Sequence, residues 1–207
     1  NITPDVCKCL LSPGEAYMSK REAILQATID VVAKSGIANS PTDLIAKQAG
    51  AAQLTLFRLF GSKKELFRQA NKEVEQRIQD VLWPAIENVK GLEEKLETLL
   101  RTGIKYFRKC PSELAYLQEY MHSIDGLTQR PDLICEKGED ISRYPLISLL
   151  NEGRAQGIFK SLRMSALVGL TGAPVIMALR EEQLMNFKLK KDEVDLLVQS
   201  CLQAVKV

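Results

Sequence analysis

The chain has 207 residues, of which 45% are hydrophobic and 26% are charged, and its net charge is +2. These values are ordinary for a soluble globular protein with room for one large domain or two small ones. The longest uncharged apolar run, residues 164–179, is shorter than the roughly 18–20 residues of a membrane span. We therefore expect a buried helix there and no contact with a membrane.

The cysteines argue against a secreted protein held together by disulfides. Their number is odd, no C-x-x-C pair occurs, and Cys7 and Cys9 are too close together for an easy mutual disulfide. We expect free thiols in a reducing cytoplasm and hence a cytoplasmic protein. No metal site is predicted, because His122, the one histidine, has no metal-ligand partner at helical spacing. The five cysteines are Cys7, Cys9, Cys110, Cys135 and Cys201.

Positive charge is concentrated in one segment of the chain. Residues 18–64 carry a net charge of +4, whereas residues 1–17 and 65–207 each carry −1. Binding to a phosphate backbone requires such an excess. A fluctuation of this size also occurs by chance, so the charge alone leaves both interpretations open.

The first helix is predicted for residues 19–34. Three apolar residues form a stripe at helical spacing: Leu25, Ile29 and Val32. The preceding residues, 1–17, have no clear periodicity. We expect them to be an N-terminal extension or loosely attached arm, or residues upstream of a biological start at Met18.

Two short helices follow the first. Ser40 is predicted to be the N-cap of the second helix, with Pro41 at its first position and Asp43 completing a pair that resembles a capping box. Gly50 breaks this helix, and a third helix is predicted for residues 53–60. The glycine and serine that come next are expected to cap the following helix.

The rest of the chain also has helical periodicity, without β-alternation long enough for a strand and without a tandem repeat. A helix is expected at 64–83, with a stop near Pro84, and another at 92–109. A short helix capped by Ser112 is expected to reach about residue 124. The next begins at 132 or 133 and reaches 156 with an interruption at Pro145, and the last two cover 164–185 and 192–205.

Residues 41–60 have the pattern of a helix-turn-helix, in which the second helix lies in the DNA major groove. Leu56 and Phe60 are expected to face the interior. Three polar residues are expected to project to the other side: Gln53, Thr55 and Arg58. Glutamine suits adenine edges, arginine suits guanine or phosphate, and threonine offers a hydroxyl or a methyl group. Lys63, at the start of the next helix, suits a phosphate.

The sequence IAKQAGAAQLTLFRLFGSKKELF, together with the helix before it, resembles the N-terminal signature of TetR-type transcriptional repressors. The likeness covers residues 19–67 and extends more weakly through GRAQGIF, residues 153–159, and the C-terminal helix. It implies an all-α homodimer with an N-terminal three-helix helix-turn-helix DNA-binding domain (18–64) and a C-terminal helical ligand-binding and dimerisation domain (65–207). It also implies DNA-facing positions at Gln53, Leu54, Thr55, Phe57 and Arg58 and phosphate-contacting positions at Thr42 and Lys63.

Several residues depart from the pattern of that family. Phe57 stands where a tyrosine is usual, Leu59 replaces a common histidine, Ala51 and Ala52 replace a common Val-Ser, and Leu54 sits where a smaller residue is common. A lost hydroxyl-to-phosphate hydrogen bond costs on the order of 1 kcal/mol per half-site. These departures leave open an alternative, a helical small-molecule-binding or scaffold protein that has lost DNA binding.

The C-terminal part has no constellation typical of an enzyme. It lacks a Gly-rich phosphate loop, paired carboxylates with a plausible base and a Ser-His-Asp set, so we predict no catalytic residue and no cofactor. Its aromatic and sulfur residues either belong to an ordinary core or line a cavity. Such a cavity, with a few polar groups, would bind an unknown, largely apolar small-molecule effector. The candidate lining residues are Trp83, Tyr106, Tyr120, His122, Tyr144 and Met164.

The last two helices are more apolar than the surface of a monomer needs, and glycine and alanine at 169–173 allow close helix approach. The resemblance implies that these helices pair with their mates in a four-helix homodimer interface. Two-fold symmetry then predicts a pseudo-palindromic operator in double-stranded DNA. We predict a ligand-responsive repressor in which an effector shifts the helix at 64–83 and changes the spacing of the two reading helices.

Overall fold

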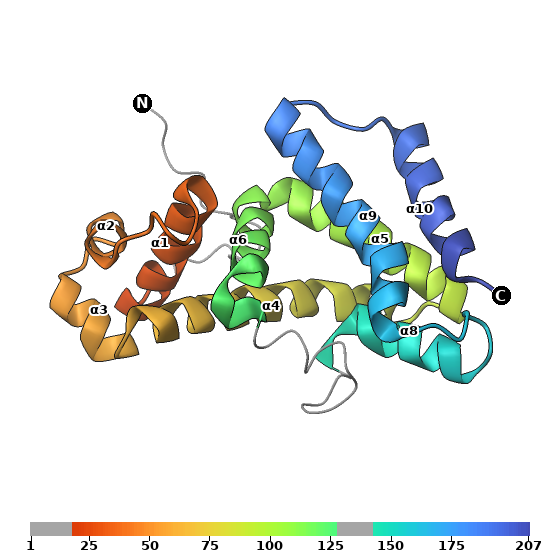
Figure 1. Ribbon diagram of the computed structural model, residues 1–207, viewed down its shortest axis with the longest axis horizontal. Coiled ribbons are helices and arrows are strands. Elements are labelled where there is room, and N and C mark those ends of the chain that lie inside the picture. Colours follow the sequence, from red (N-terminus) through yellow and green to blue (C-terminus); the bar gives the residue numbers. More distant parts are fainter. Residues whose placement is uncertain (1–17, 128–142) are drawn as a thin grey trace. The chain divides into compact units, whose positions relative to one another are not determined.

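The structure, a computed structural model, describes residues 18–127 and 143–207. In these ranges the chain is helical, with one isolated β-bridge between Phe159 and Lys206 and no strand, which confirms the all-α class (Figure 1). The arm at 1–17 and the first half of the helix expected from 132 or 133 lie outside the described residues. The helices are α1 (Lys20–Ser35), α2 (Thr42–Gln48), α3 (Gln53–Phe60), α4 (Lys63–Glu87), α5 (Leu92–Lys109), α6 (Pro111–His122), α8 (Pro145–Ala155), α9 (Met164–Met185) and α10 (Lys191–Val205).

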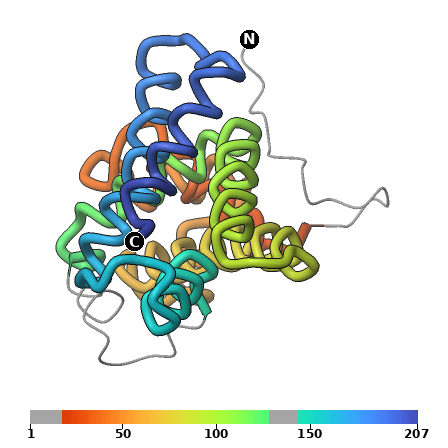
Figure 2. Tube along the Cα trace, turned by 90° about the vertical axis from the view of Figure 1, so that its right-hand side faces the viewer, coloured from red at the N-terminus to blue at the C-terminus, as the bar shows by residue number. Residues whose placement is uncertain are grey.

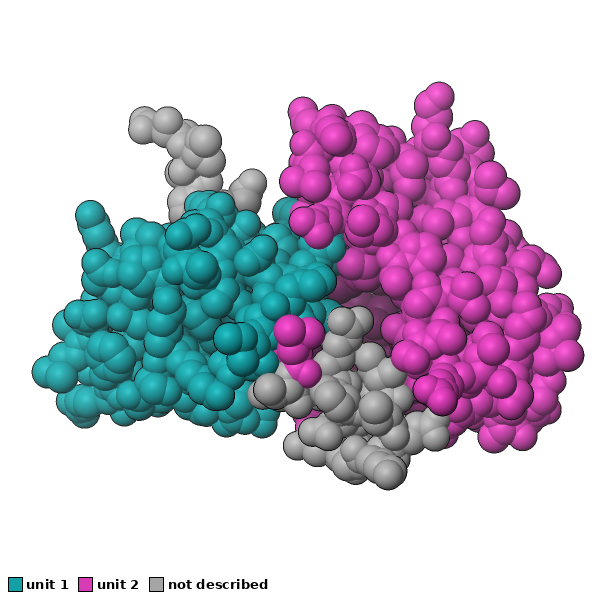
Figure 3. Space-filling view, in the orientation of Figure 1, with its two compact units in different colours: residues 1–74, 109–125 teal, residues 75–108, 126–207 magenta. Residues whose placement is uncertain are grey.

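The helices group into two compact units, coloured separately in Figure 3. The first unit comprises residues 1–74 and 109–125, and the second comprises residues 75–108 and 126–207. Helix α4 contributes to both units, and α6 is grouped with α1 to α3. The first unit thus extends past residue 64, and the functional division at that residue stays a prediction.

Helix α1 is the centre of the first unit and packs against α2, α3 and α6. Its start is fixed by a capping box, in which Ser19 Oγ accepts from the Glu22 amide at 3.2 Å and the Ser19 amide donates to Glu22 Oε2 at 2.8 Å. The predicted stripe of Leu25, Ile29 and Val32 is buried, each residue being at most 1% exposed. The apolar period therefore identified the core face of this helix.

The predicted cap of α2 is wrong. Ser40 is buried, and its hydroxyl donates to the carbonyl oxygen of Gly36 at 2.6 Å instead of capping the helix. Pro41 occupies the N-cap position, and no side chain caps the helix. The hydroxyl satisfies a carbonyl at the end of α1, because Gly36, at φ 76°, turns the chain back at that point.

The predicted end of the helix near Pro84 is also wrong, because α4 runs through this proline to Glu87. A proline inside a helix removes one amide donor and frees the carbonyl four residues earlier, here that of Asp80. Both residues are exposed, so water can hydrate that carbonyl and the helix continues.

Helix α6 begins earlier than expected, at Pro111, with Cys110 at its N-cap position and no side-chain cap from Ser112. Cys110 is buried and takes part in a disulfide bond, so the expectation of free thiols is wrong for this residue. Sequence spacing cannot reveal pairs that the tertiary fold brings together. Cys201 is free, and burial raises the pKa of its thiol. Three cysteines lie outside the described residues: Cys7, Cys9 and Cys135.

In the second unit, α9 packs against α8 and runs beside α10 (Figure 2). The segment after α8 joins the C-terminus, where the Lys160 amide donates to the carbonyl oxygen of Val205 at 2.7 Å and the Val207 amide donates to that of Ile158 at 3.2 Å. Phe159 is 1% exposed. This segment therefore anchors the C-terminal helix within the unit.

Helix α9 is long and apolar enough to cross a membrane by length and composition alone, but only 28% of its most apolar window is buried inside the molecule. The expectation of a buried helix is therefore wrong for the single chain. Leu170, Met177 and Leu184 are exposed, and they recur every seven residues on one side of the helix. This side of α9 has no cover in the described residues.

Candidate nucleic-acid interface

Helices α2 and α3 pack on α1 and on each other, as a helix-turn-helix requires. Leu56 and Phe60, at 0% and 3% exposure, hold α3 in the core, which confirms their predicted role as anchors. The turn before α3 contains Gly50 at φ 60°, and its carbonyl oxygen accepts a hydrogen bond from Lys20 Nζ at 2.9 Å. The α2 end of the turn is thus tied to the start of α1.

The outer side of α3 carries most of the predicted DNA-facing residues. Leu54 is 74% exposed and Phe57 is 41% exposed, Arg58 is exposed, and Thr55 is half-buried. Since successive residues turn by about 100°, Leu54, Arg58 and Thr55 lie within roughly 100° of one another around the axis. They form one outward surface, which we call the α3 face.

Gln53 does not share the α3 face. It lies about 140° from Arg58 around the helix axis, so the prediction that these two residues project together is wrong. The Gln53 amide instead donates from Nε2 to Thr42 Oγ1 at 2.9 Å. The first residue of α3 is thereby hydrogen-bonded to the first residue of α2.

The positive side chains around α3 differ in whether another side chain already pairs with them. Arg58 and Lys47 are exposed and have no partner among the described residues. Lys63 places its ammonium group 5.3 Å from the centre of the Phe67 ring, a cation–π contact that is weak at exposed sites. Lys64 pairs with Asp125 at 2.6 Å. Arg58, Lys47 and Lys63 therefore remain able to bind phosphate.

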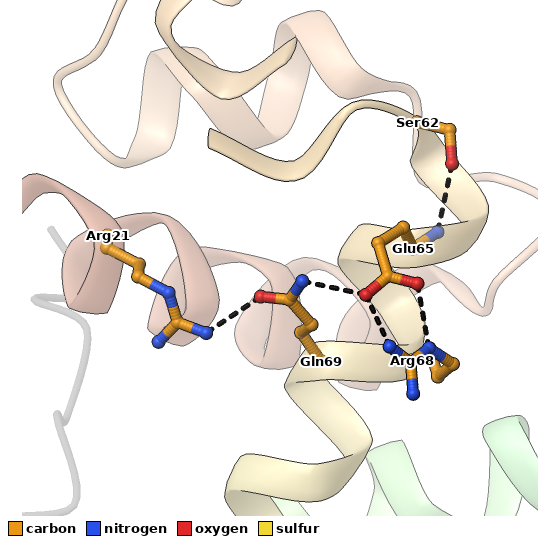
Figure 4. Close-up of polar contacts among 5 residues, drawn as sticks. All are labelled: Arg21, Ser62, Glu65, Arg68 and Gln69. Atoms are coloured by element: carbon orange, nitrogen blue, oxygen red, sulfur yellow. Dashed lines mark hydrogen bonds and ion pairs between the residues drawn. The ribbon is translucent and has the colours of Figure 1, made fainter. Parts of the chain in front are cut away.

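The start of α4, directly after α3, is held by a hydrogen-bonded network (Figure 4). Ser62 Oγ accepts from the Glu65 amide at 3.1 Å, which confirms that this serine caps the helix. The Glu65 carboxylate accepts from Arg68 at 2.6 and 2.7 Å and from Gln69 at 2.7 Å. These bonds, that from Arg68 foremost, lower the pKa of Glu65 to about 2. Gln69 in turn accepts from Arg21 on α1 at 2.7 Å.

This network gives the α3 face a rigid support. Arg21 also lies over the Phe60 ring, with its guanidinium carbon 5.7 Å from the ring centre. One arginine of α1 thus contacts both the end of α3 and the first turns of α4. A helix held in this way can keep the side chains of its outer face in fixed positions.

The six candidates for an effector pocket fall in different units. Trp83, Tyr106, Tyr144 and Met164 belong to the second unit, whereas Tyr120 and His122 belong to the first. Tyr106, Tyr120 and Met164 are buried. His122 is exposed, and its Nδ1 lies 2.6 Å from the Gln118 carbonyl oxygen of its own helix. Their common role in one pocket stays a prediction.

Trp83 lines an open pocket of about 380 Å³ in the second unit, together with Pro84, Ile86, Glu87 and Lys95. The indole nitrogen of Trp83 donates to the Arg143 carbonyl oxygen at 3.2 Å. No group of residues that could hold a metal ion occurs in the part of the chain that the structure describes.

One buried polar residue of the second unit carries no signal in the sequence. Gln79 lies one helical turn before Trp83 on α4 and is 8% exposed. Its amide nitrogen is buried without a hydrogen-bond partner among residues 18–127 and 143–207. A buried donor without a partner is costly. Periodicity indicated only the helix, since it cannot reveal whether a buried amide finds a partner.

Comparisons with known proteins agree with this geometry. Residues 24–70 match the family model for bacterial regulatory proteins of the tetR family. The nucleoid occlusion factor SlmA of Aliivibrio fischeri strain MJ11 is 26% identical over 155 residues, which cover 73% of this chain and 79% of that protein.

Solved structures share the fold. A TetR family transcription regulator from Marinobacter aquaeolei VT8 superposes with a TM-score of 0.77 at 22% identity, over 90% of this chain and 95% of that one. FadR of Bacillus subtilis, solved in complex with stearoyl-CoA, gives a TM-score of 0.67 at 22% identity, over 87% and 95%. The family match thus covers the part of the chain that contains α2, α3 and the α3 face, and the chain shares the fold of solved TetR-family structures.

Proposed function

We propose that the protein is a cytoplasmic, ligand-responsive transcriptional repressor that binds a pseudo-palindromic operator as a homodimer and is released by a small-molecule effector. The observation that carries the proposal is the α3 face, in which exposed Leu54 and unpaired Arg58 stand on a helix anchored by Leu56 and Phe60. A buried, braced helix with an uncompensated arginine on its outer side suits the major groove. The proposal includes no enzymatic activity.

Phosphate contacts complete the proposed interface. Lys63, at the start of α4, adds its charge to the free amides of the first helical turn, where an anion is favoured. Thr42 holds the equivalent place at the start of α2, and its hydroxyl retains donor capacity, because it is the acceptor in the bond from Gln53. Phe57 offers no hydroxyl, so its proposed contribution is apolar contact alone.

The homodimer is proposed to form through α9 and α10. Their exposed apolar side chains include Leu170, Met177 and Leu184 on α9 and Leu196 on α10, which is 71% exposed. Pairing of such surfaces about a two-fold axis removes them from water. The two α3 faces would then address half-sites about one DNA turn apart.

The effector is proposed to be largely apolar and to bind in the second unit. Gln79 supplies a buried donor without a partner, and Trp83 lies one turn away beside an open pocket. Since B. subtilis FadR was solved with stearoyl-CoA, this compound is the first probe to use. Trp83 is the only tryptophan, so its fluorescence reports binding near α4. A fluorescence change together with release of DNA is expected, and titration without either result would contradict this choice of effector.

The test of operator binding begins with duplexes selected by the full chain from a random-sequence pool. We expect a footprint of two protected stretches about one helical turn apart and a complex that contains two copies of the chain per duplex, measured by light scattering. Failure to enrich any duplex would contradict DNA binding. A single stretch protected by one copy would contradict the dimeric arrangement but leave DNA binding standing.

A further inference from the structure

Leu54 has no structural role that explains its presence on α3. It is 74% exposed, whereas the residues that hold the helix in the core, Leu56 and Phe60, are buried. It shares the α3 face with Arg58, which follows one turn later and has no partner in the described part of the chain. An exposed leucine beside an unpaired arginine indicates a surface that recognises a mixed apolar and polar target.

We propose that Leu54 reads the C5-methyl group of a thymine in each operator half-site, next to a guanine read by Arg58; this inference rests on the proposed DNA binding. Thymine alone presents an apolar group at its edge in the major groove. Guanine, cytosine and adenine place hydrogen-bonding groups but no methyl group at this edge, whereas thymine places a methyl group beside its O4 acceptor. A leucine leaves hydrogen-bonding groups unpaired, and an unpaired buried polar group costs free energy. Leu54 therefore discriminates in favour of thymine.

The spacing of the two side chains sets the spacing of the two bases. Residues i and i+4 of a helix have Cβ atoms about 5–6 Å apart, and bases along one strand are separated by roughly 3.4 Å. The thymine and the guanine are therefore separated by about one or two base steps. Arginine is the side chain that most often reads guanine, through its O6 and N7 atoms.

Gln53 is less available for base reading than its type suggests. Its amide nitrogen donates to Thr42 at 2.9 Å, and it lies away from the α3 face. A bidentate contact to adenine would require that this bond break. The half-site is thus read first through a methyl group and a guanine, with adenine contacts from Gln53 absent.

A protein partner is the competing occupant of this apolar surface, and the structure favours DNA. A desolvated protein contact over Leu54 would also cover Arg58, whose charge no described residue compensates, so such a partner would have to supply a carboxylate at that point. Burying an uncompensated charge is costly, whereas guanine and the adjacent phosphates supply acceptors for it. The test below separates the two occupants.

The test uses duplexes selected by the full chain from a random-sequence pool, and affinity is measured by fluorescence anisotropy at fixed salt. Each thymine of the selected half-site is replaced in turn by deoxyuridine, which lacks only the methyl group. For the wild type we expect about fourfold weaker binding at one thymine per half-site, the factor that corresponds to burying one methyl group. Leu54→Ala should bind the unmodified duplex more weakly and should be insensitive to that replacement.

Leu59→Ala is the matched control. Leu59 is an exposed leucine of the same helix, 42% exposed, and it lies about 140° from Leu54 around the axis. This variant should keep the full sensitivity to deoxyuridine. Because Leu54 lies in water, its truncation should leave the melting curve, followed by circular dichroism, unchanged.

Two results overturn the inference while the proposed function stands. In one, the chain binds selected duplexes but no thymine methyl group affects its affinity; in the other, Leu54→Ala remains as sensitive to deoxyuridine as the wild type. If no duplex is enriched at all, the proposed DNA binding falls and the inference falls with it. Each result is therefore distinguishable from the others.

Discussion

The ion pair between Arg108 on α5 and Glu182 on α9 joins three parts of the second unit. Arg108 Nε donates to Glu182 Oε2 at 3.0 Å, and Nη2 makes a second bond to Oε1. The Leu189 amide, in the α9–α10 connection, donates to Glu182 Oε1 at 2.9 Å. The side chain of Glu182 is 6% exposed and that of Arg108 is 27% exposed. Replacement of Glu182 by alanine should therefore destabilise the unit strongly.

The expected loss of unfolding free energy follows from the charge of Arg108, which loses its partner in Glu182→Ala. Removing one partner of a buried ion pair costs about 3–5 kcal/mol, because the other charge stays buried without compensation. Arg108 retains some access to water, so we expect a loss of about 3 kcal/mol for Glu182→Ala. The double variant Arg108→Leu with Glu182→Leu removes both charges and should be more stable than Glu182→Ala.

The measurement is urea unfolding followed by the fluorescence of Trp83, which belongs to the same unit. Burial raises the pKa of Glu182, but the hydrogen bonds from Arg108 and Leu189 outweigh it, so the pKa lies below its ordinary value. The carboxylate thus stabilises the fold above its unfolded pKa of about 4.3, and this contribution is lost as the pH falls towards the lower folded pKa. The difference between wild type and Glu182→Ala should therefore narrow on acidification from pH 6. A loss below about 1 kcal/mol at pH 7, or a difference that does not narrow, would refute this reasoning.

Three further substitutions test other parts of the structure. Gly153→Ala should lower the free energy of unfolding by about 2 kcal/mol, because the new Cβ would lie 2.0 Å from the Phe159 ring. This clash outweighs the preference of alanine for helix, which is about 1 kcal/mol. Gly103→Ala on α5, where nothing lies within 4 Å of the new Cβ, is the control and should not lower the free energy of unfolding. Ser62→Ala should cost about 1 kcal/mol through loss of the α4 cap, and an unchanged urea midpoint by circular dichroism would contradict that role. Leu170→Glu should convert the proposed dimer to a monomer in light scattering, and a variant that stays dimeric would exclude this face of α9 from the interface.

Local sequence signals predicted the helices that depend on local chemistry. The limits of α5 and α9 agree with the prediction. Gly91 and Pro111 flank α5, and α9 ends before Asn186, which adopts the left-handed conformation at φ 51°. Ser62 caps α4 as expected, because capping involves residues only three positions apart.

Two polar side chains have other partners than their residue type suggests. Ser40 has the composition of a cap, but its hydroxyl donates to the carbonyl oxygen of Gly36, four residues earlier, where the chain turns back after α1. Gln53 has the composition of a base-reading residue, a role that stays a prediction, and its amide donates to Thr42 Oγ1 on another helix. Such choices depend on which groups the fold brings within bonding distance, and a linear pattern does not contain this information. The common role of the six candidate pocket residues stays a prediction for the same reason, since they fall in two different units.

The salt dependence of DNA binding tests the central claim most directly. Affinity for a selected duplex is measured between about 50 and 200 mM salt for the wild type and for the double variant Arg58→Ala with Lys63→Ala. The control is Lys105→Ala, which replaces an exposed lysine on α5 in the second unit. We expect the magnitude of the slope of log affinity against log salt to fall by at least about 0.9 per half-site in the double variant and to stay unchanged in the control. A double variant that binds with the affinity and salt slope of the wild type would contradict the assignment of α3 and the start of α4 as the DNA-binding surface.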